Sequence, residues 1–321
     1  MNGLFQGPGG PTIRTDLPLP PIAEGDAMIR LSLGGVCATD LEIAKGYMGF
    51  EGVMGHEFVG VVEEVGSSAH ANWVGTRVVG DINCSCGSCS TCQAGRPTHC
   101  PQRTVLGIVG RDGAFQEQFA LPVANLHAVP PAVSDDAAVF VEPLAAACQI
   151  LEQVHVRPSH SVAVLGIGRL GQMCVRVLAL TGAEVVAFSR NPKRATDLPP
   201  GVAVHPVGQA PSRCFDRVVD TTGNPEGLRQ ATALVRPRGT IILKTTVHEA
   251  TAPPPTPWVL DEITLVGSRC GPFAPALRLL ASGRVDPTPL ITARYELRDA
   301  VRALDAASRR EHVKVVIAGN G

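Results

Sequence analysis

The stretch VAVLGIGRLGQMCVRVLALTG, residues 162–182, places three glycines in the spacing G-x-G-x-x-G between an apolar, β-branched run and a helical pattern. The three glycines are Gly166, Gly168 and Gly171. A tight turn from a strand into a helix points backbone amides, here those of Arg169 and Leu170, at an anion such as a pyrophosphate. A glycine triplet alone also occurs in plain turns, but the strand before it, the helix after it and a strand at 184–189 supply the required context. The sequence therefore predicts a dinucleotide-binding site.

Strands and helices alternate along this half of the chain. The expected strands are 161–165, 184–189, 202–207, 217–222, 240–247 and 263–268, and the expected helices are about 169–181 and 225–235. Strands that alternate with helices form a parallel sheet that is covered on both faces. This part of the chain is therefore predicted to be a doubly wound α/β domain.

The end of the strand at 184–189 indicates which dinucleotide is bound. An Asp or Glu there binds the ribose hydroxyls of NAD, whereas a small residue followed by Arg accommodates the 2′-phosphate of NADP. The chain reads AFSRNPKR, so Ser189 stands where the acid would be and Arg190 follows it, with Lys193 and Arg194 close behind. This pattern favours NADP over NAD. The other interpretation is that these basic residues only solvate the start of a helix.

The first part of the chain is rich in short β-branched runs. Residues 26–36, 58–66 and 76–82 are such runs, punctuated by glycine as in the strands of a partly closed β structure. From Ser134 onward the pattern becomes helical, and Pro143 predicts a break or bend in that helix. With 321 residues, 45% of them apolar, the chain is long enough for two domains.

Four cysteines crowd the segment CGSCSTCQAGRPTHC, residues 86–100. They are Cys86, Cys89, Cys92 and Cys100, with the spacing C-x2-C-x2-C-x7-C. In a reducing compartment, cysteines this close bind metal more often than they form disulfides, and four thiolates make a closed, structural zinc site. An iron-sulfur cluster and a disulfide pair remain as alternatives. The other cysteines outside this spacing are expected to be bystanders, mostly small buried hydrophobes: Cys84, Cys148, Cys174, Cys214 and Cys270.

Composition limits the partners and the compartment. The formal net charge is −1, and no block of Lys or Arg would attract nucleic acid or anionic lipid. No run of about 18 uncharged apolar residues occurs, and the N-terminus lacks the apolar stretch of a signal peptide. We therefore expect a cytoplasmic protein with small-molecule partners, no nucleic acid and no membrane.

Two further segments supply metal-binding side chains outside the cysteine lobe. GVCATD contains Cys37, and GHE contains His56. A thiolate and an imidazole held by separate turns suit an open, catalytic zinc site, which needs a third protein ligand. Each residue alone is equally consistent with a buried side chain that binds nothing.

At this point a resemblance covers most of the chain. GVCATD, GHEFVG, the four-cysteine lobe, VEPLAAA and LGIGRLG follow one another in the order of the medium-chain dehydrogenase/reductase superfamily. The likeness is to its zinc-dependent alcohol and sorbitol dehydrogenase branch. It implies a β-rich, GroES-like catalytic domain over residues 1–149, completed by about 269–321, and a Rossmann domain over 150–268. The segment HVKVVIAG, 312–319, would return as a strand to the first domain.

The resemblance also implies roles for individual residues. Cys37, His56 and Glu142 would bind the catalytic zinc, and Glu57 would be a nearby carboxylate able to ligate or to exchange with water. These four and two others complete the expected site: Thr39, which would accept the alcohol proton, and Asp40, which would orient a metal-bound His. Hydride would then pass between substrate and nicotinamide. One departure concerns the proton's exit, since Glu42 stands where liver-type enzymes have a His.

Different classes of function stay open. The leading hypothesis is an enzyme with two zinc ions per chain that oxidises an alcohol, polyol or sugar, or reduces the matching carbonyl, with NADP. An NAD-linked enzyme of the same type is the first alternative. The second is a non-catalytic sensor that binds zinc and NADPH. The family resemblance implies a homo-dimer or homo-tetramer, and Tyr47, Met48 and Phe50 are candidates to line the substrate pocket.

Overall fold

The computed structural model describes residues 1–244 and 254–319. The chain divides into two compact units, one formed by Met1–Glu142 with Ala276–Gly321 and the other by Pro143–Pro275. The boundaries predicted from the sequence lie a few residues away from these.

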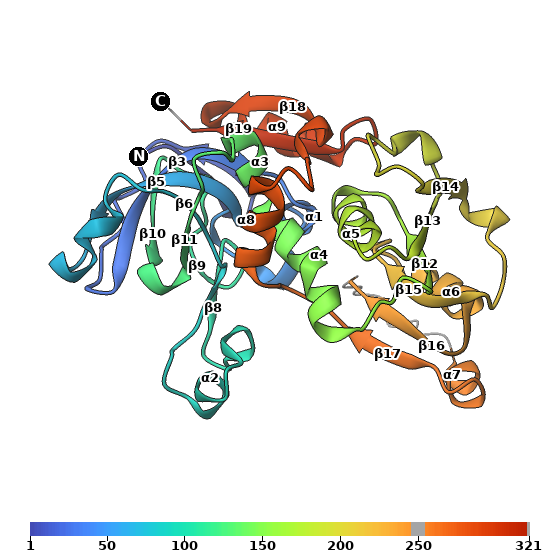
Figure 1. The fold of residues 1–321 in the computed structure, drawn as a ribbon. Helices are drawn as coiled ribbons and strands as arrows, with labels where there is room; N and C mark the ends of the chain where they lie inside the picture. The colour runs from blue at the N-terminus through green and yellow to red at the C-terminus, as the bar shows by residue number, and fades with distance from the viewer. Residues whose placement is uncertain (245–253, 320–321) are drawn as a thin grey trace. The chain divides into compact units, whose positions relative to one another are not determined.

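The second unit contains a parallel sheet of six strands (Figure 1). In spatial order the strands are β14 Ala203–Pro206, β13 Glu184–Ser189, β12 Ser161–Leu165, β15 Phe215–Asp220, β16 Val235–Leu243 and β17 Thr264–Gly267. Every residue from Val162 to Leu165 is fully buried, which requires cover on both faces of the sheet. The predicted doubly wound α/β domain is therefore confirmed. The order of strands reverses between β12 and β15, and ligands bind at the carboxyl ends of strands beside such a reversal.

Helices connect these strands. They are α5 Arg169–Ala179, α6 Pro225–Leu234 and α7 Thr256–Leu260. Ala231 and Leu234 of α6 pack in one hydrophobic cluster with Ala163 and Leu165 of β12, on one face of the sheet. The strand predicted at 240–247 ends at Leu243, and its last three positions lie outside the described residues.

The first unit is built around a seven-stranded sheet. Its path runs β11 Leu126–Ala128, β6 Arg77–Gly80, β5 Glu57–Val65, β3 Asp26–Gly35, β19 Lys314–Ala318 and β18 Ile291–Glu296, while β10 Gln118–Pro122 also pairs with β3. Two smaller sheets contain β1 Gly3–Gly7, β2 Gly10–Arg14 and β4 Gly52–Val53, and β7 Asn83–Cys84, β8 Thr104–Leu106 and β9 Gly110–Arg111. The α-helices that begin or lie in this unit, or cross its boundary, are α1 Ala38–Ile43, α2 Ser90–Gln93, α3 Asp135–Ala138, α4 Val141–Gln153, α8 Phe273–Ala281 and α9 Ala300–Ser308.

Three neighbouring strands of this sheet come from opposite ends of the chain. Gly35 at the carboxyl end of β3 is in register with Glu57 at the start of β5. The same glycine is in register with Val316 of β19, which runs antiparallel to β3. The carboxyl end of β3 and the amino ends of β5 and β19 therefore lie side by side. Cys37 follows β3 by two residues, His56 directly precedes β5, and Lys314 is the first residue of β19.

The predicted helix after Ser134 is two helices, and the break does not fall at Pro143. The side chain of Ser134 caps α3, which ends at Ala138, and α4 begins at Val141. Pro143 is the third residue of α4. An N–H in the first turn of a helix has no intrahelical acceptor, so proline, which has no N–H, is tolerated there. The expected bend is therefore not required.

No helix in the described ranges has the length and apolar character that crossing a bilayer requires.

Candidate active site

Three potential metal ligands converge where the carboxyl end of β3 and the amino ends of β5 and β19 lie side by side. One ligand atom from each of Cys37, His56 and Glu57 lies within 4.8 Å of the other two. Cys37 precedes α1, while His56 and Glu57 lie at the start of β5 and are almost completely buried. Thiolate, imidazole and carboxylate are the ligand types that zinc takes in proteins, so this donor set fits the metal.

Asp40 supports both Cys37 and His56. Its carboxylate accepts a hydrogen bond of 2.8 Å from the backbone N–H of Cys37 and lies 3.2 Å from His56 Nδ1. Burial disfavours the charged imidazole, but Asp40 outweighs it and raises the pKa of His56 well above its ordinary value. Burial likewise opposes the Cys37 thiolate, but the hydrogen bond and charge of His56 lower the pKa of Cys37 to about 7. With Nδ1 directed at Asp40, the opposite ring nitrogen of His56 is left to face Cys37 and a metal.

A buried lysine completes the surroundings of this group, and the sequence reasoning missed it. Lys314 at the start of β19 forms an ion pair with Glu57, and neither side chain is more than marginally exposed. Its ammonium also lies 5.4 Å from the centre of the Phe140 ring. A Cβ on Gly35 would lie 2.6 Å from the Glu57 carboxylate and 2.7 Å from the Lys314 ammonium, so only glycine leaves room for this pair. The one sequence signal was a lysine at the start of an otherwise apolar strand.

Two other predicted residues do not belong to this group. Thr39 Oγ1 is 3.9 Å from Cys37 Sγ. Glu142 is the second residue of α4, half-buried, and is not one of the three residues whose ligand atoms converge. Its coordination of the metal stays a prediction.

The four-cysteine lobe has the geometry of a tetrahedral zinc site. Neighbouring sulfurs are 3.5 to 4.0 Å apart: Cys86–Cys92, Cys89–Cys92, Cys89–Cys100 and Cys86–Cys100. Four sulfurs at zinc–sulfur bond length around one ion would be about 3.8 Å apart, whereas a disulfide needs about 2 Å. Backbone amides of Ser88 and Cys89 lower the pKa of Cys86 to about 6, but burial and Cys89 raise that of Cys92 to about 11. A cation would therefore be required to hold four thiolates together.

The cysteines outside these two groups form no disulfide within the described residues. Burial raises the pKa of Cys174 to about 12 and that of Cys84 to about 11, as expected of inert side chains. Cys214 is exposed, so the prediction that it packs among apolar neighbours is wrong. It is the last residue of an exposed segment, 211–214, that directly precedes β15.

The glycine turn after β12 leaves room for a phosphate. Gly166 has φ +89°, a conformation that glycine adopts without strain, and Gly171 approaches it so closely that a Cβ would lie 2.1 Å from the Gly166 carbonyl oxygen. A Cβ on Gly168, in contrast, would meet no atom within 4 Å. Gly168 caps the N-terminus of α5, so open space lies beside the first backbone amides of that helix, as dinucleotide binding requires.

The end of β13 carries the residues expected to distinguish NADP from NAD. Ser189 is buried, and its hydroxyl accepts a hydrogen bond of 3.1 Å from the backbone N–H of Asn191. Arg190 and Lys193 are exposed, and Arg194 is half-buried. The strand therefore ends in a small hydroxyl followed by a cationic turn, with no carboxylate between Ser189 and Arg194.

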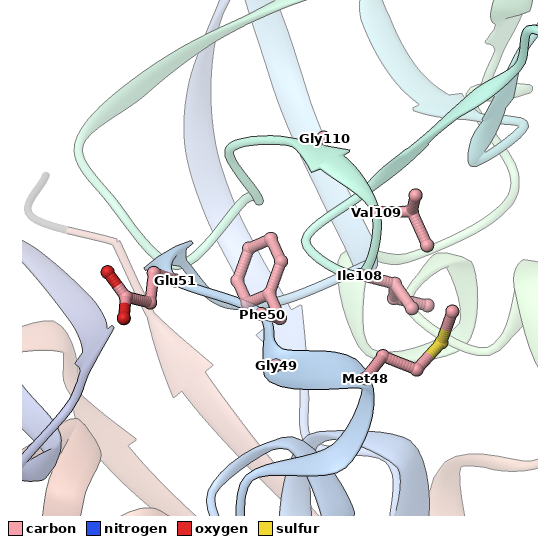
Figure 2. A pocket seen from close by; sticks show the side chains of 7 residues that line it. All are labelled: Met48, Gly49, Phe50, Glu51, Ile108, Val109 and Gly110. Carbon is pink, nitrogen blue, oxygen red and sulfur yellow. The ribbon is translucent and has the colours of Figure 1, made fainter.

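A pocket of about 410 Å³ lies between two loops of the first unit (Figure 2). Its lining residues are Met48, Gly49, Phe50, Glu51, Ile108, Val109 and Gly110. Figure 2 shows the Met48 side chain on the side of Ile108 and Val109, whereas the Glu51 carboxylate points the other way. Phe50 belongs to the same hydrophobic cluster as Val36 and Met54, which neighbour the metal-binding group in sequence, and Ile108 packs against that cluster. Tyr47 packs against this cluster and is not among the residues that line the pocket.

Comparison with known proteins places this chain in a family. Residues 23–131 match the model of the alcohol dehydrogenase GroES-like domain. The chain is 33% identical over 328 residues to an L-threonine 3-dehydrogenase of Streptomyces avermitilis, with 92% of each protein covered. It is 28% identical to sorbitol dehydrogenase of Bacillus subtilis, covering 95% of this chain and 93% of that protein.

Solved structures agree. The alcohol dehydrogenase TADH from Thermus sp. ATN1 superposes with a TM-score of 0.90, at 28% identity and with both chains fully covered. A protein of Sinorhizobium meliloti 1021 described as a zinc-binding dehydrogenase and bound to NADP gives 0.89 at 26% identity, covering 99% and 98%. The rspB alcohol dehydrogenase of E. coli CFT073, complexed with NADH, gives 0.88 at 25% identity, covering 99% of both chains. The chain is therefore a member of the medium-chain dehydrogenase/reductase superfamily, in its zinc-dependent alcohol and polyol dehydrogenase branch, and an oxidoreductase with a nicotinamide cofactor.

Proposed function

We propose that this enzyme transfers hydride between an alcohol, polyol or sugar, or the matching carbonyl compound, and NADP(H), with the aid of a catalytic zinc. The observation that carries the proposal is that the ligand atoms of Cys37 and His56 lie close together beside the buried Glu57, with His56 Nδ1 directed at Asp40. Three protein ligands leave one position of a tetrahedral zinc open, and catalytic zinc sites differ from structural ones in that respect.

We assign the third ligand to Glu142 rather than to Glu57. Glu57 is paired with the buried Lys314, and separating a buried ion pair to free one carboxylate is costly. Glu142, in the first turn of a neighbouring helix, matches the family position of the third ligand. Glu57 then lies beside the metal, as a carboxylate able to bind it in exchange for water. With the cysteine lobe as a second site, the proposal gives two zinc ions per chain.

The chain's own residues account for binding and proton movement. When bound, zinc in such a site lowers the pKa of a hydroxyl oxygen, and the nicotinamide accepts hydride. Thr39, beside Cys37, relays the proton of the substrate hydroxyl, since its Oγ1 accepts that proton as it donates its own proton onward. Glu42 is exposed and forms an ion pair with Lys45, so it does not take the place of the missing His, and the proton leaves through water.

For the cofactor we propose NADP(H), because Ser189 leaves the space and Arg190 supplies the charge that a 2′-phosphate needs. For the substrate we propose that the pocket formed by Met48, Phe50, Ile108 and Val109 receives carbon atoms away from the reacting one. A cytoplasmic location and a homo-dimer or homo-tetramer complete the proposal. The edge strand β17 and the exposed Val259 and Leu260 of α7 are candidates for that interface.

The test is reduction of NADP by zinc-loaded protein against a panel of simple alcohols, polyols and sugars. We expect turnover with at least one of them, faster with NADP than with NAD. Arg190→Ala is expected to weaken NADPH binding by about 10-fold or more, since it removes a charged hydrogen bond, and to leave NADH binding nearly unchanged. Tight NADPH binding without turnover on any compound would favour the sensor. Equal weakening of both cofactors by Arg190→Ala would contradict the NADP assignment.

A further inference from the structure

Two buried polar side chains of α5 hold the segment that follows β13. Gln172 is 0% exposed and Arg176 is 3% exposed. Buried amide and guanidinium groups need hydrogen-bond partners, because burying them without such partners would destabilise the domain. Most of the partners of these two lie on one short stretch of backbone, residues 194–197.

Gln172 links this stretch to the glycine turn. Its Nε2 donates to the carbonyl of Arg194 and to that of Ile167, both at 3.3 Å. Its Oε1 accepts a hydrogen bond of 3.1 Å from the backbone N–H of Thr196. One side-chain amide therefore joins the turn expected to bind pyrophosphate to the segment expected to bind the ribose end of the cofactor.

Arg176 holds the end of the same stretch. Its Nη2 donates to the carbonyl of Thr196 at 3.0 Å and to that of Asp197 at 2.9 Å. Asp197 has φ +46°, in the left-handed region that residues other than glycine rarely adopt. The guanidinium binds the carbonyl of this strained residue, so it stabilises a backbone conformation that the segment would otherwise leave.

The segment is thus fixed at both ends. The Ser189 hydroxyl binds the N–H of Asn191 at the start, and Gln172 and Arg176 bind residues 194–197 at the end. The exposed Arg190 lies within the turn that this Ser189–Asn191 bond closes, and Lys193 lies between that turn and residues 194–197. A loop that is already ordered loses less conformational entropy when a ligand binds, so its charges bind a phosphate more tightly than those of a mobile loop.

We propose that Gln172 and Arg176 are positioning residues for cofactor selectivity: they fix the segment 190–197 so that Arg190 meets the 2′-phosphate of NADP(H). Both are buried inside the domain and act through Arg190 rather than by touching the cofactor. This inference rests on the proposed use of NADP(H).

The experiment is a double-mutant cycle on full-length, zinc-loaded protein. Dissociation constants of NADPH and NADH are measured by nucleotide fluorescence for Gln172→Leu and Arg176→Met, each alone and combined with Arg190→Ala. Alone, each variant is expected to weaken NADPH binding by about 5- to 20-fold and NADH binding by less than about twofold. In the Arg190→Ala background the further loss of NADPH affinity is expected to vanish, because the charge to be positioned is gone.

Milder variants and a matched control complete the design. Arg176→Lys keeps the charge but cannot reach both carbonyls, so it is expected to give a smaller loss in the same direction. Gln172→Glu keeps the acceptor for Thr196 and removes the donor. If the Gln172→Leu or Arg176→Met protein does not fold, these two variants replace them in the double-mutant cycle. Arg217→Met is the control, since Arg217 also donates to backbone carbonyls, those of Asp216 and His155, and should change neither dissociation constant.

The possible outcomes separate the inference from the function on which it rests. Equal weakening of NADPH and NADH by the α5 variants, or a loss that persists in full with Arg190→Ala, would show that Gln172 and Arg176 are merely structural. A normal NADPH affinity in those variants, with Arg190→Ala still weakening it, would overturn the inference alone. If Arg190→Ala itself has no effect on NADPH, the NADP assignment fails and the inference fails with it.

Discussion

Asp40 is the residue on which the geometry of the metal-binding group depends. Its carboxylate is completely buried and has two partners, the Cys37 backbone N–H and His56 Nδ1. The first contact fixes the turn that presents the thiol, and the second fixes which ring nitrogen of His56 faces the metal. A carboxylate behind a metal-bound imidazole also makes that nitrogen a stronger donor.

Replacing Asp40 by Asn should therefore weaken the catalytic zinc without unfolding the domain. The amide keeps an acceptor for Cys37, but it loses the negative charge and can donate to Nδ1, which would favour the wrong tautomer of His56. We expect Asp40→Asn to lower metal affinity or activity by about 10- to 100-fold. Metal content and kcat with the best alcohol of the panel would measure this. Glu64→Gln, an exposed acid on β5, is the control, and an Asp40→Asn enzyme with full zinc and full activity would contradict the role.

At the level of residues, the sequence was most informative where spacing alone implies chemistry. The four cysteines of residues 86–100 can be recognised as a cluster because their ligand atoms are close in sequence. Lys314 could not be recognised in the same way, since it meets Glu57 only after β19 returns to β3 from the far end of the chain. No local pattern marks a lysine whose partner is 257 positions away.

At the level of elements, the strands of the second unit were predicted well because their type follows from continuous apolar runs. Helix ends were harder to predict. The break between α3 and α4 falls at Val139 and Phe140, and Pro143 is accommodated in the first turn of α4, where a proline does not interrupt a helix. The parallel sheet of the second unit also contains a buried carboxylate, Asp216 of β15, whose burial the apolar pattern of the strand does not predict.

Asp216 links the amino ends of three strands. It accepts hydrogen bonds from the backbone N–H and the hydroxyl of Ser161 at 2.9 and 3.1 Å, and it forms an ion pair with Arg236. Burial raises the pKa of Asp216, but the bonds from Ser161 and the charge of Arg236 prevail and lower it. A carboxylate whose folded pKa is depressed stabilises the fold at pH values above its unfolded pKa, about 4. That contribution is lost as the pH falls through the lower, folded pKa.

We expect Asp216→Asn to reduce the free energy of unfolding by about 1 to 3 kcal/mol at pH 7, because the amide removes the negative charge and one of the two acceptor oxygens, so that either Ser161 or Arg236 loses its partner. Near pH 3 the difference from the unaltered protein should shrink, since the carboxyl of the unfolded chain is then mostly protonated. Chemical denaturation at the two pH values measures the effect, with Glu184→Gln on β13 as an exposed control. The same difference at both pH values would mean that the charge of Asp216 is not what stabilises the strands.

At the level of the whole molecule, the two units differ in how far their folds follow from local sequence. The nucleotide-binding unit is one continuous segment, Pro143–Pro275, and its order of strands and helices can be followed in the sequence. The other unit joins both ends of the chain, and its seven-stranded sheet depends on pairings between distant strands. The GroES-like and Rossmann architecture was predictable through the family resemblance, and it is confirmed. The register that brings β3, β5 and β19 together was not.

The central claim is that a second zinc ion, beyond the one in the cysteine lobe, is held by an incomplete set of protein ligands. The most direct test is metal analysis of the holoenzyme combined with a crystal structure that locates each ion by anomalous scattering. We expect two zinc ions per chain, one at Cys86, Cys89, Cys92 and Cys100, and one bound by Cys37, His56 and a single carboxylate with one position open. A single ion confined to the cysteine lobe, or a second ion closed by four protein side chains, would contradict the account.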